Sequence, residues 1–138
     1  LARAGARVTL VESSEQATAD ARDNLADLDV TVVTADVADV MDELADVDVV
    51  VLDPPRSGAG PDVCRALAAL RPDRLVYVAC DPAALARDTK ALLAEGMQLA
   101  SVRGLDVFGH TAHVEAVATF LPVSGAAIDD STAGAEGQ

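Results

Sequence analysis

The chain has 138 residues, of which 51% are hydrophobic and 2% aromatic, a composition that predicts one globular domain with an aliphatic core. Its formal net charge of −13 makes most of the surface unfavourable for a nucleic-acid backbone. Residues 1–50, with 12 acidic and 3 basic side chains, carry most of that charge, whereas residues 51–122, with 8 and 7, are nearly neutral and would be the better candidate for contacting any nucleic acid.

The sequence has no long apolar run and no signal peptide at its start, so we expect no membrane span. Its two cysteines form no disulfide framework, which favours a cytoplasmic protein. Short β-branched runs alternate with helical segments along the chain. Residues 1–5 read as the last turn of a helix and its glycine cap, so we expect a chain that begins inside a fold. Strands are predicted at 7–11, 30–34, 47–52, 75–79, 98–105 and 113–121. Helices are predicted from a cap at Ser13 or Ser14 to Leu28, and at 37–44, 61–70 and 82–95.

This alternation indicates an α/β fold with a mostly parallel sheet. The predicted domain covers residues 1–122, and the Ser-, Gly- and Ala-rich residues 123–138 are predicted to form a disordered tail.

Each of the first four predicted strands is followed within two positions by a polar residue: Glu12, Asp36, Asp53 and Cys80. Ligands of open α/β sheets bind at the carboxyl ends of the strands, so these side chains are expected to line one rim. An acid at the position of Glu12 can bond the ribose hydroxyls of a cofactor, although a helix-capping or solvated glutamate is the alternative. For Asp36, capping of the next helix is an equally good interpretation.

Residues 53–58 (DPPRSG) form a more specific motif. Two prolines stiffen the turn after a predicted buried strand and hold the Asp53 carboxylate at the rim, where a planar base can be hydrogen-bonded. Arg56 can reach a phosphate or a carboxylate. The alternative is a rigid loop with a purely structural role.

Cys80 directly precedes Asp81 and Pro82, which are a suitable N-cap and first residue for the next helix. The helix dipole favours a thiolate at this position, whereas the Asp81 carboxylate opposes it. A buried structural cysteine is the alternative, and it is the preferred interpretation for Cys64, which lies on an Ala/Leu helix face.

Glu115 lies within an otherwise apolar strand, where a carboxylate is costly unless it has a partner or a task such as accepting a proton. His110 and His113 are close to it in sequence, but the set lacks compelling metal geometry, and we expect no metal site.

Three segments, LDPPRSG (52–58), VYVACDPAALARD (76–88) and DVFGHTAHVEAV (106–117), closely resemble the RNA uracil-5-methyltransferases. The resemblance extends over residues 1–121. It implies a Rossmann-like catalytic domain that uses S-adenosyl-L-methionine and acts on transfer or ribosomal RNA, in an enzyme that is monomeric when full length. The first strand and glycine-rich cofactor loop of that fold are absent here, so we expect the fragment alone to be inactive, to bind cofactor poorly and to be marginally stable.

The resemblance also implies roles for single residues. Cys80 is the expected nucleophile, which adds to carbon 6 of uracil, and Glu115 is the expected base, which removes the carbon 5 proton. The expected cofactor-binding residues are Glu12, Asp36 and Asp53, and the expected substrate-binding residues are Asp53, Arg56, His110 and Thr111.

The motifs depart from the family pattern at two places. The family usually has Ser-Cys-Asn-Pro where residues 79–82 read Ala-Cys-Asp-Pro, and a proline where Gly109 stands. Neither change removes a proposed catalytic group, although Asp81 adds a negative charge beside the thiol.

Two other functions are compatible with parts of the sequence. An exocyclic amino methyltransferase also uses an Asp/Asn-Pro-Pro corner, but it needs an aromatic residue after the prolines, where Arg56 stands. A non-catalytic α/β nucleotide-binding module fits the acidic rim, but it leaves the motifs around Cys80 and Glu115 unexplained.

Overall fold

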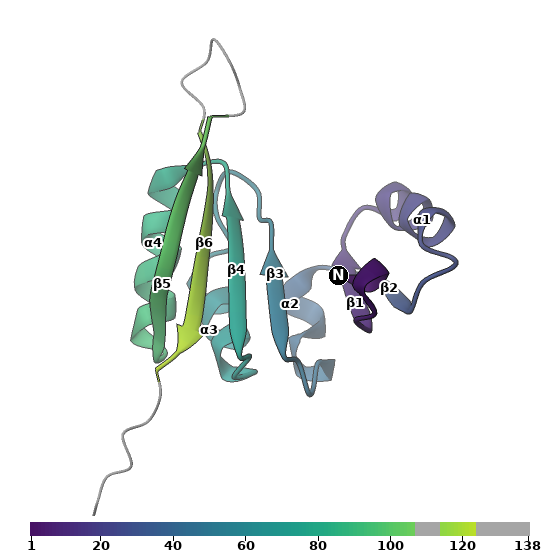
Figure 1. The fold of residues 1–138 in the computed structure, drawn as a ribbon, viewed down its shortest axis with the longest axis horizontal. Helices are drawn as coiled ribbons and strands as arrows, with labels where there is room; N and C mark the ends of the chain where they lie inside the picture. The colour runs from purple at the N-terminus through teal and green to yellow at the C-terminus, as the bar shows by residue number, and fades with distance from the viewer. Residues whose placement is uncertain (107–113, 124–138) are drawn as a thin grey trace, which may run out of the picture.

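Six strands alternate with four α-helices over residues 1–106 and 114–123, the part of the chain that the computed structural model describes (Figure 1). The strands are β1 (Val8–Glu12), β2 (Val30–Thr34), β3 (Val49–Leu52), β4 (Arg74–Ala79), β5 (Met97–Leu105) and β6 (Glu115–Pro122). The helices are α1 (Glu15–Asn24), α2 (Val37–Val40), α3 (Pro61–Ala69) and α4 (Pro82–Ala94), and 3-10 turns cover Ala2–Ala4 and Met41–Glu43. Every predicted strand and helix is present. Of the predicted tail, only Val123 lies within the described residues.

The helix ends follow local capping chemistry. The Ser14 side chain accepts a hydrogen bond from the Ala17 amide, so Ser14 rather than Ser13 caps α1. This helix ends at Asn24 and not at Leu28 as predicted, because the Leu28 amide donates to the Leu25 carbonyl in a tight turn that leads into β2. The predicted helix at 37–44 is likewise shorter, since it tightens into a 3-10 turn after Val40.

The strands form two sheets, and most of them run in one direction. Strands β1 and β2 pair in parallel, and the second sheet has the order β3-β4-β6-β5. In this second sheet β3 and β4 are parallel, while β6 runs antiparallel to both β4 and β5. Strands β3, β4 and β5 therefore share one direction, as predicted for a mostly parallel sheet.

No ladder joins the β1–β2 pair to the four-stranded sheet within the described residues. In the view of Figure 1 this pair and α1 are set apart from the larger sheet, on the side of β3. The edge of β3 that is not bonded to β4 therefore has no strand partner in this part of the chain.

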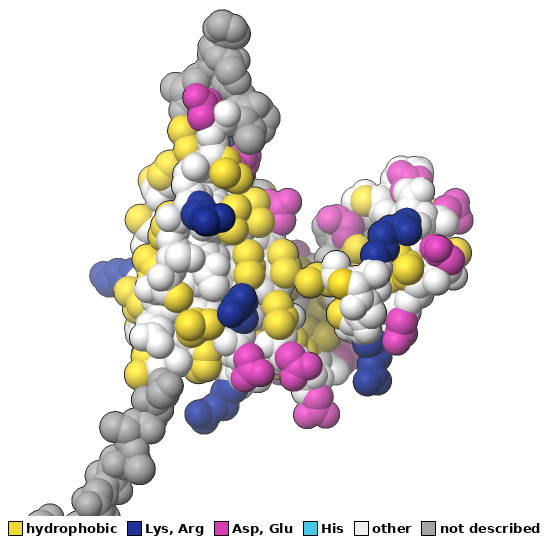
Figure 2. All heavy atoms as spheres, in the orientation of Figure 1, with side chains coloured by type: hydrophobic (Ala, Val, Ile, Leu, Met, Phe, Trp, Pro, Cys, Tyr) yellow, Lys and Arg dark blue, Asp and Glu magenta, His cyan; other side chains and the backbone are white. Residues whose placement is uncertain are grey.

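The core lies between the four-stranded sheet and the helices. Alternate residues of β4 and β6 are buried on the face that α3 and α4 cover, among them Leu75, Tyr77 and Phe120, which are fully buried. The intervening residues point to the other face, which we call the open face. Val49 and Val51 lie on it and are 44% and 52% exposed. Figure 2 shows hydrophobic side chains gathered over β3, β4 and β6 on this side. No helix in the described residues is long and apolar enough to cross a membrane.

Candidate active site

The four side chains predicted to line one rim lie at or just after the ends of strands in two separate sheets. Glu12 is the last residue of β1 and Asp36 follows β2 by two residues, so both lie at the carboxyl end of the parallel β1–β2 pair. Asp53 and Cys80 directly follow β3 and β4, which are also parallel. The structure thus brings Asp53 and Cys80 to one end of the four-stranded sheet.

Cys80, which directly follows β4, and Glu115, the first residue of β6, lie at the same end of the same sheet. The antiparallel register of β4 and β6 pairs Ala79 with Ala116, so the next step of that register sets Cys80 opposite Glu115. Residues directly opposite in an antiparallel pair have Cα atoms about 4.5–5.5 Å apart and side chains on one face. Ala116 is buried on the helix-covered face, so Glu115 points to the open face. Both side chains are half-buried.

The surroundings of Cys80 follow from the helix that comes after it. The Asp81 carboxylate caps α4 by accepting a hydrogen bond from the Ala84 amide at 2.7 Å, and Pro82 is the first helical residue. Cys80 therefore immediately precedes the N-cap, as predicted. The capping bond directs one Asp81 oxygen to the helix end, where amide dipoles offset its negative charge.

The Asp53-Pro54-Pro55 corner is exposed at the rim. The Gly58 amide donates to the Pro55 carbonyl at 2.8 Å, which closes a tight turn after the two prolines. Asp53 and Arg56 are both exposed. Their side chains are therefore accessible to a ligand at this end of the sheet.

Glu12 and Asp36 each accept a hydrogen bond from an amide near the start of a helix. One Glu12 oxygen accepts from the Ser14 amide at 2.7 Å, at the start of α1. Asp36 caps α2 by accepting from the Ala38 amide at 2.9 Å. The capping interpretation is therefore supported for Asp36, whereas Glu12 bonds the amide of Ser14, the residue that caps α1. Each bond uses one oxygen of its carboxylate, so it does not conflict with a ligand-binding role at the same rim.

Cys64 lies in the core, as expected for a structural cysteine. Its side chain is fully buried in α3. Burial, together with the negative charge of Asp88, raises the pKa of its thiol to about 12. A thiol that stays protonated is a poor nucleophile, which leaves Cys80 as the reactive candidate of the two.

Sequence reasoning missed a buried polar pair, Tyr77 and Asp88, which bonds the loop that follows the Asp53 corner. The Tyr77 hydroxyl donates to Asp88 at 2.5 Å, and burial, followed by this bond, raises the pKa of Tyr77 well above its usual value. A signal was present: Asp88 is spaced four residues from Ala84 and from Leu92, which places a carboxylate on the buried stripe of α4.

His110 and Thr111, two of the predicted substrate-binding residues, lie outside the described residues, as does His113. Within the described part of the chain, no three His, Cys, Asp or Glu side chains gather as metal ligands.

Residues 23–121 match the sequence profile of the family described as tRNA (Uracil-5-)-methyltransferase. The chain belongs to this family. Within the family range, the three motifs that carried the resemblance contain Asp53, Cys80 and Glu115, so the family assignment made from the sequence is confirmed.

Two relatives illustrate the extent of the similarity. An RNA methyltransferase of Streptomyces coelicolor is 44% identical over 117 residues, which cover 83% of this chain and 26% of that protein. The 23S rRNA (uracil(1939)-C(5))-methyltransferase of Yersinia enterocolitica is 50% identical over 78 residues, which cover 56% of this chain and 17% of that protein. The chain thus spans about a quarter or less of the length of these two relatives.

A solved structure confirms the fold. The tRNA (uracil-54, C5)-methyltransferase of Pyrococcus abyssi, in complex with S-adenosyl-L-homocysteine, matches with a TM-score of 0.76 and 34% sequence identity. The match covers 88% of this chain and 30% of that one. The predicted Rossmann-like methyltransferase fold is therefore correct.

Proposed function

We propose that this chain is part of the catalytic domain of an RNA methyltransferase that transfers a methyl group from S-adenosyl-L-methionine to carbon 5 of a uridine in transfer or ribosomal RNA. The observation that supports the proposal is the register of β4 and β6, which pairs Ala79 with Ala116 and, continued by one residue, would bring Cys80 opposite Glu115. A nucleophile and a proton acceptor at the same end of neighbouring strands could act on the two carbon atoms of one double bond, the nucleophile by adding to one carbon and the acceptor by removing a proton from the other.

The proposed reaction uses Cys80 first and Glu115 last. The Cys80 thiolate adds to carbon 6 of uracil, and the electron pair of the carbon 5–carbon 6 double bond moves toward the carbonyl at carbon 4. The bound cofactor supplies the methyl group that carbon 5 takes up. Glu115 then removes the carbon 5 proton, the double bond forms again, and the Cys80 thiolate leaves. Since the ring edge of a stacked base is out of reach, the uridine enters extra-helically.

The acidic residues at the rim fit the cofactor chemically. Ribose hydroxyls, the adenine amino group and the ammonium group of S-adenosyl-L-methionine are hydrogen-bond donors, and carboxylates accept from them. We assign cofactor binding to Glu12, Asp36 and Asp53, with Asp53 placed between the cofactor and the target base. Arg56, exposed on the same corner, is assigned to the RNA backbone, together with His110 and Thr111 on the substrate side.

We expect the chain alone to bind this cofactor weakly. Glu12 and Asp36 lie on the β1–β2 pair, whereas Asp53 lies on the other sheet, and no ladder fixes one sheet to the other in the described residues. Preorganisation of the three carboxylates is therefore incomplete. Isothermal titration calorimetry with S-adenosyl-L-methionine checks this, and a dissociation constant in the micromolar range for the isolated chain contradicts it.

A hybrid enzyme provides the test of function. It carries this chain in the place of the matching segment of the Pyrococcus abyssi methyltransferase, so that the parts of the relative beyond the match are present. Incubated with S-adenosyl-L-methionine and RNA that contains 5-fluorouridine, the hybrid is expected to form an RNA–protein adduct that survives denaturation. Fluorine at carbon 5 leaves no proton for Glu115 to remove, so the adduct cannot resolve. A folded hybrid that forms no such adduct contradicts the proposed function.

A further inference from the structure

Asp88 is a buried carboxylate, 4% exposed, that binds the loop following the Asp53 corner. One of its oxygens accepts hydrogen bonds from the Ala59 amide at 2.7 Å and the Gly60 amide at 3.4 Å, besides the bond from Tyr77. The Tyr77 hydroxyl also accepts from the Ala59 amide at 3.3 Å. Three donors thus converge on one carboxylate oxygen in the interior.

The loop lies close against α4 over four successive residues, 57–60. A Cβ atom added at Gly58 would lie 2.6 Å from the Asp88 oxygen and 3.3 Å from the Ala84 side chain, so only glycine fits there. Gly58 also has a φ of +84°, which glycine adopts without strain. The Arg87 guanidinium adds a bond of 3.3 Å to the Ser57 carbonyl from the outer side of the helix.

The loop and α4, which these hydrogen bonds join, both begin next to residues of the proposed active site. The loop begins at Asp53, which is assigned to the base and the cofactor, and α4 begins directly after Cys80. Tyr77 belongs to β4, the strand that ends at Cys80. A bond network that fixes the loop to α4 and β4 therefore fixes the Asp53 corner relative to Cys80.

We propose that Asp88, together with Tyr77, is a positioning residue for methyl transfer: it holds the Asp53 corner at the distance from Cys80 that the uracil ring requires. This inference rests on the proposed function. A misplacement of about 1 Å costs on the order of a hundredfold in rate when reacting groups must be aligned. The Asp88 carboxylate is buried against residues 59 and 60 and touches neither substrate nor cofactor in this assignment.

The test compares three variants of the hybrid enzyme. Asp88→Ala removes the acceptor, and Tyr77→Phe removes one donor while keeping the ring. Asp88→Asn keeps the shape and an acceptor oxygen, so it is expected to retain more activity than Asp88→Ala. Two quantities are measured on folded protein at low temperature: hydrogen exchange of the Ala59 and Gly60 amides, and the rate of adduct formation at saturating 5-fluorouridine RNA.

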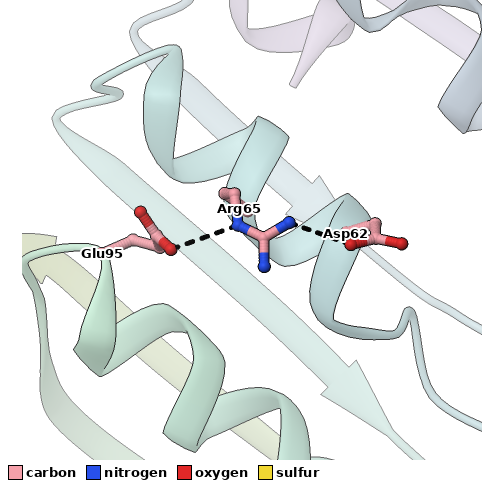
Figure 3. A network of polar contacts seen from close by, with 3 residues as sticks. All are labelled: Asp62, Arg65 and Glu95. Carbon is pink, nitrogen blue, oxygen red and sulfur yellow. Dashed lines mark hydrogen bonds and ion pairs between the residues drawn. The ribbon is translucent and has the colours of Figure 1, made fainter.

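A matched control breaks a different contact to α4. Figure 3 shows Arg65 of α3 between Asp62 and Glu95, with ion-pair distances of 2.9 and 3.4 Å. Arg65→Ala removes the link between α3 and the end of α4 but leaves residues 57–60 untouched. Because exposed ion pairs contribute little, this variant is expected to keep the exchange rates and the adduct rate of the parent hybrid.

We expect Asp88→Ala to accelerate exchange of both amides and to slow adduct formation by about tenfold to a hundredfold, the range that loss of a hydrogen bond to a charged group predicts. If exchange accelerates while the adduct forms at the parental rate, the positioning role is wrong and the proposed function stands. If the parent hybrid forms no adduct, the proposed function is wrong, and the positioning role falls with it.

Discussion

Replacing Cys80 by alanine is expected to abolish both adduct formation and methylation in the hybrid enzyme. Without the sulfur nucleophile, carbon 5 of uracil is not activated, so binding and cofactor positioning are of no use to the reaction. Removal of a nucleophile from an enzyme with a covalent intermediate costs a factor of about 10⁴ or more in kcat. Transfer of labelled methyl groups to RNA measures the rate, and a denaturing gel with 5-fluorouridine RNA measures the adduct.

Cys64 provides the matched control, since it is the other cysteine of the chain. Cys64→Ala also deletes one thiol, but from the core beneath α3, where its pKa is raised to about 12 and the thiol stays protonated. This variant is expected to lose some stability and to keep its methylation rate once the folded fraction is matched. Methylation by Cys80→Ala at the parental rate would exclude the covalent mechanism and favour an exocyclic amino methyltransferase.

Much of the rim could be predicted from the sequence because it depends on local rules. Asp53 and Cys80 each stand one residue after a short apolar strand, and the carboxyl ends of parallel strands meet at one edge. Asp81 was predicted as an N-cap because aspartate before proline at a helix start satisfies free amides, and it caps α4 as expected.

The proposed pairing of Cys80 with Glu115 needed more than local rules. They are 35 positions apart, and a shift of one residue in the register between β4 and β6 would turn Glu115 to the helix-covered face. That register is set by burial of Ala116, Ala118 and Phe120 against the helices, which is a property of the packed sheet. The resemblance to a family supplied the pairing that the sequence pattern by itself could not.

The Asp88 network was missed because its bonds reach residues 28 and 29 positions away along the chain. Helical periodicity places Asp88 on the buried stripe of α4, but periodicity does not reveal which donors come from elsewhere. The extent of α1 was overestimated for a simpler reason: the turn at Leu25–Leu28 that feeds β2 contains no glycine or proline to mark it.

Glu115→Gln is expected to separate the two halves of the reaction. Glutamine keeps the size of the side chain and its place at the start of β6, but it cannot take up the carbon 5 proton. Methyl transfer can still occur, and the methylated uridine then stays bound to Cys80. We expect an adduct that accumulates with ordinary uridine RNA and resolves about 10²–10⁴-fold more slowly than in the parent hybrid. The measurement is a single-turnover time course of labelled methyl in protein-bound and free RNA.

Glu95→Gln is the matched control for this result. The change in chemistry is the same, but Glu95 lies at the C-terminal end of α4, where it pairs with Arg65 on the surface. It is expected to release product at the parental rate. Should Glu115→Gln release methylated RNA as fast as the parent, another group removes the proton. Should it fail to form any adduct, Glu115 acts before methyl transfer, in the attack of Cys80 on carbon 6, because its position opposite Cys80 allows either role.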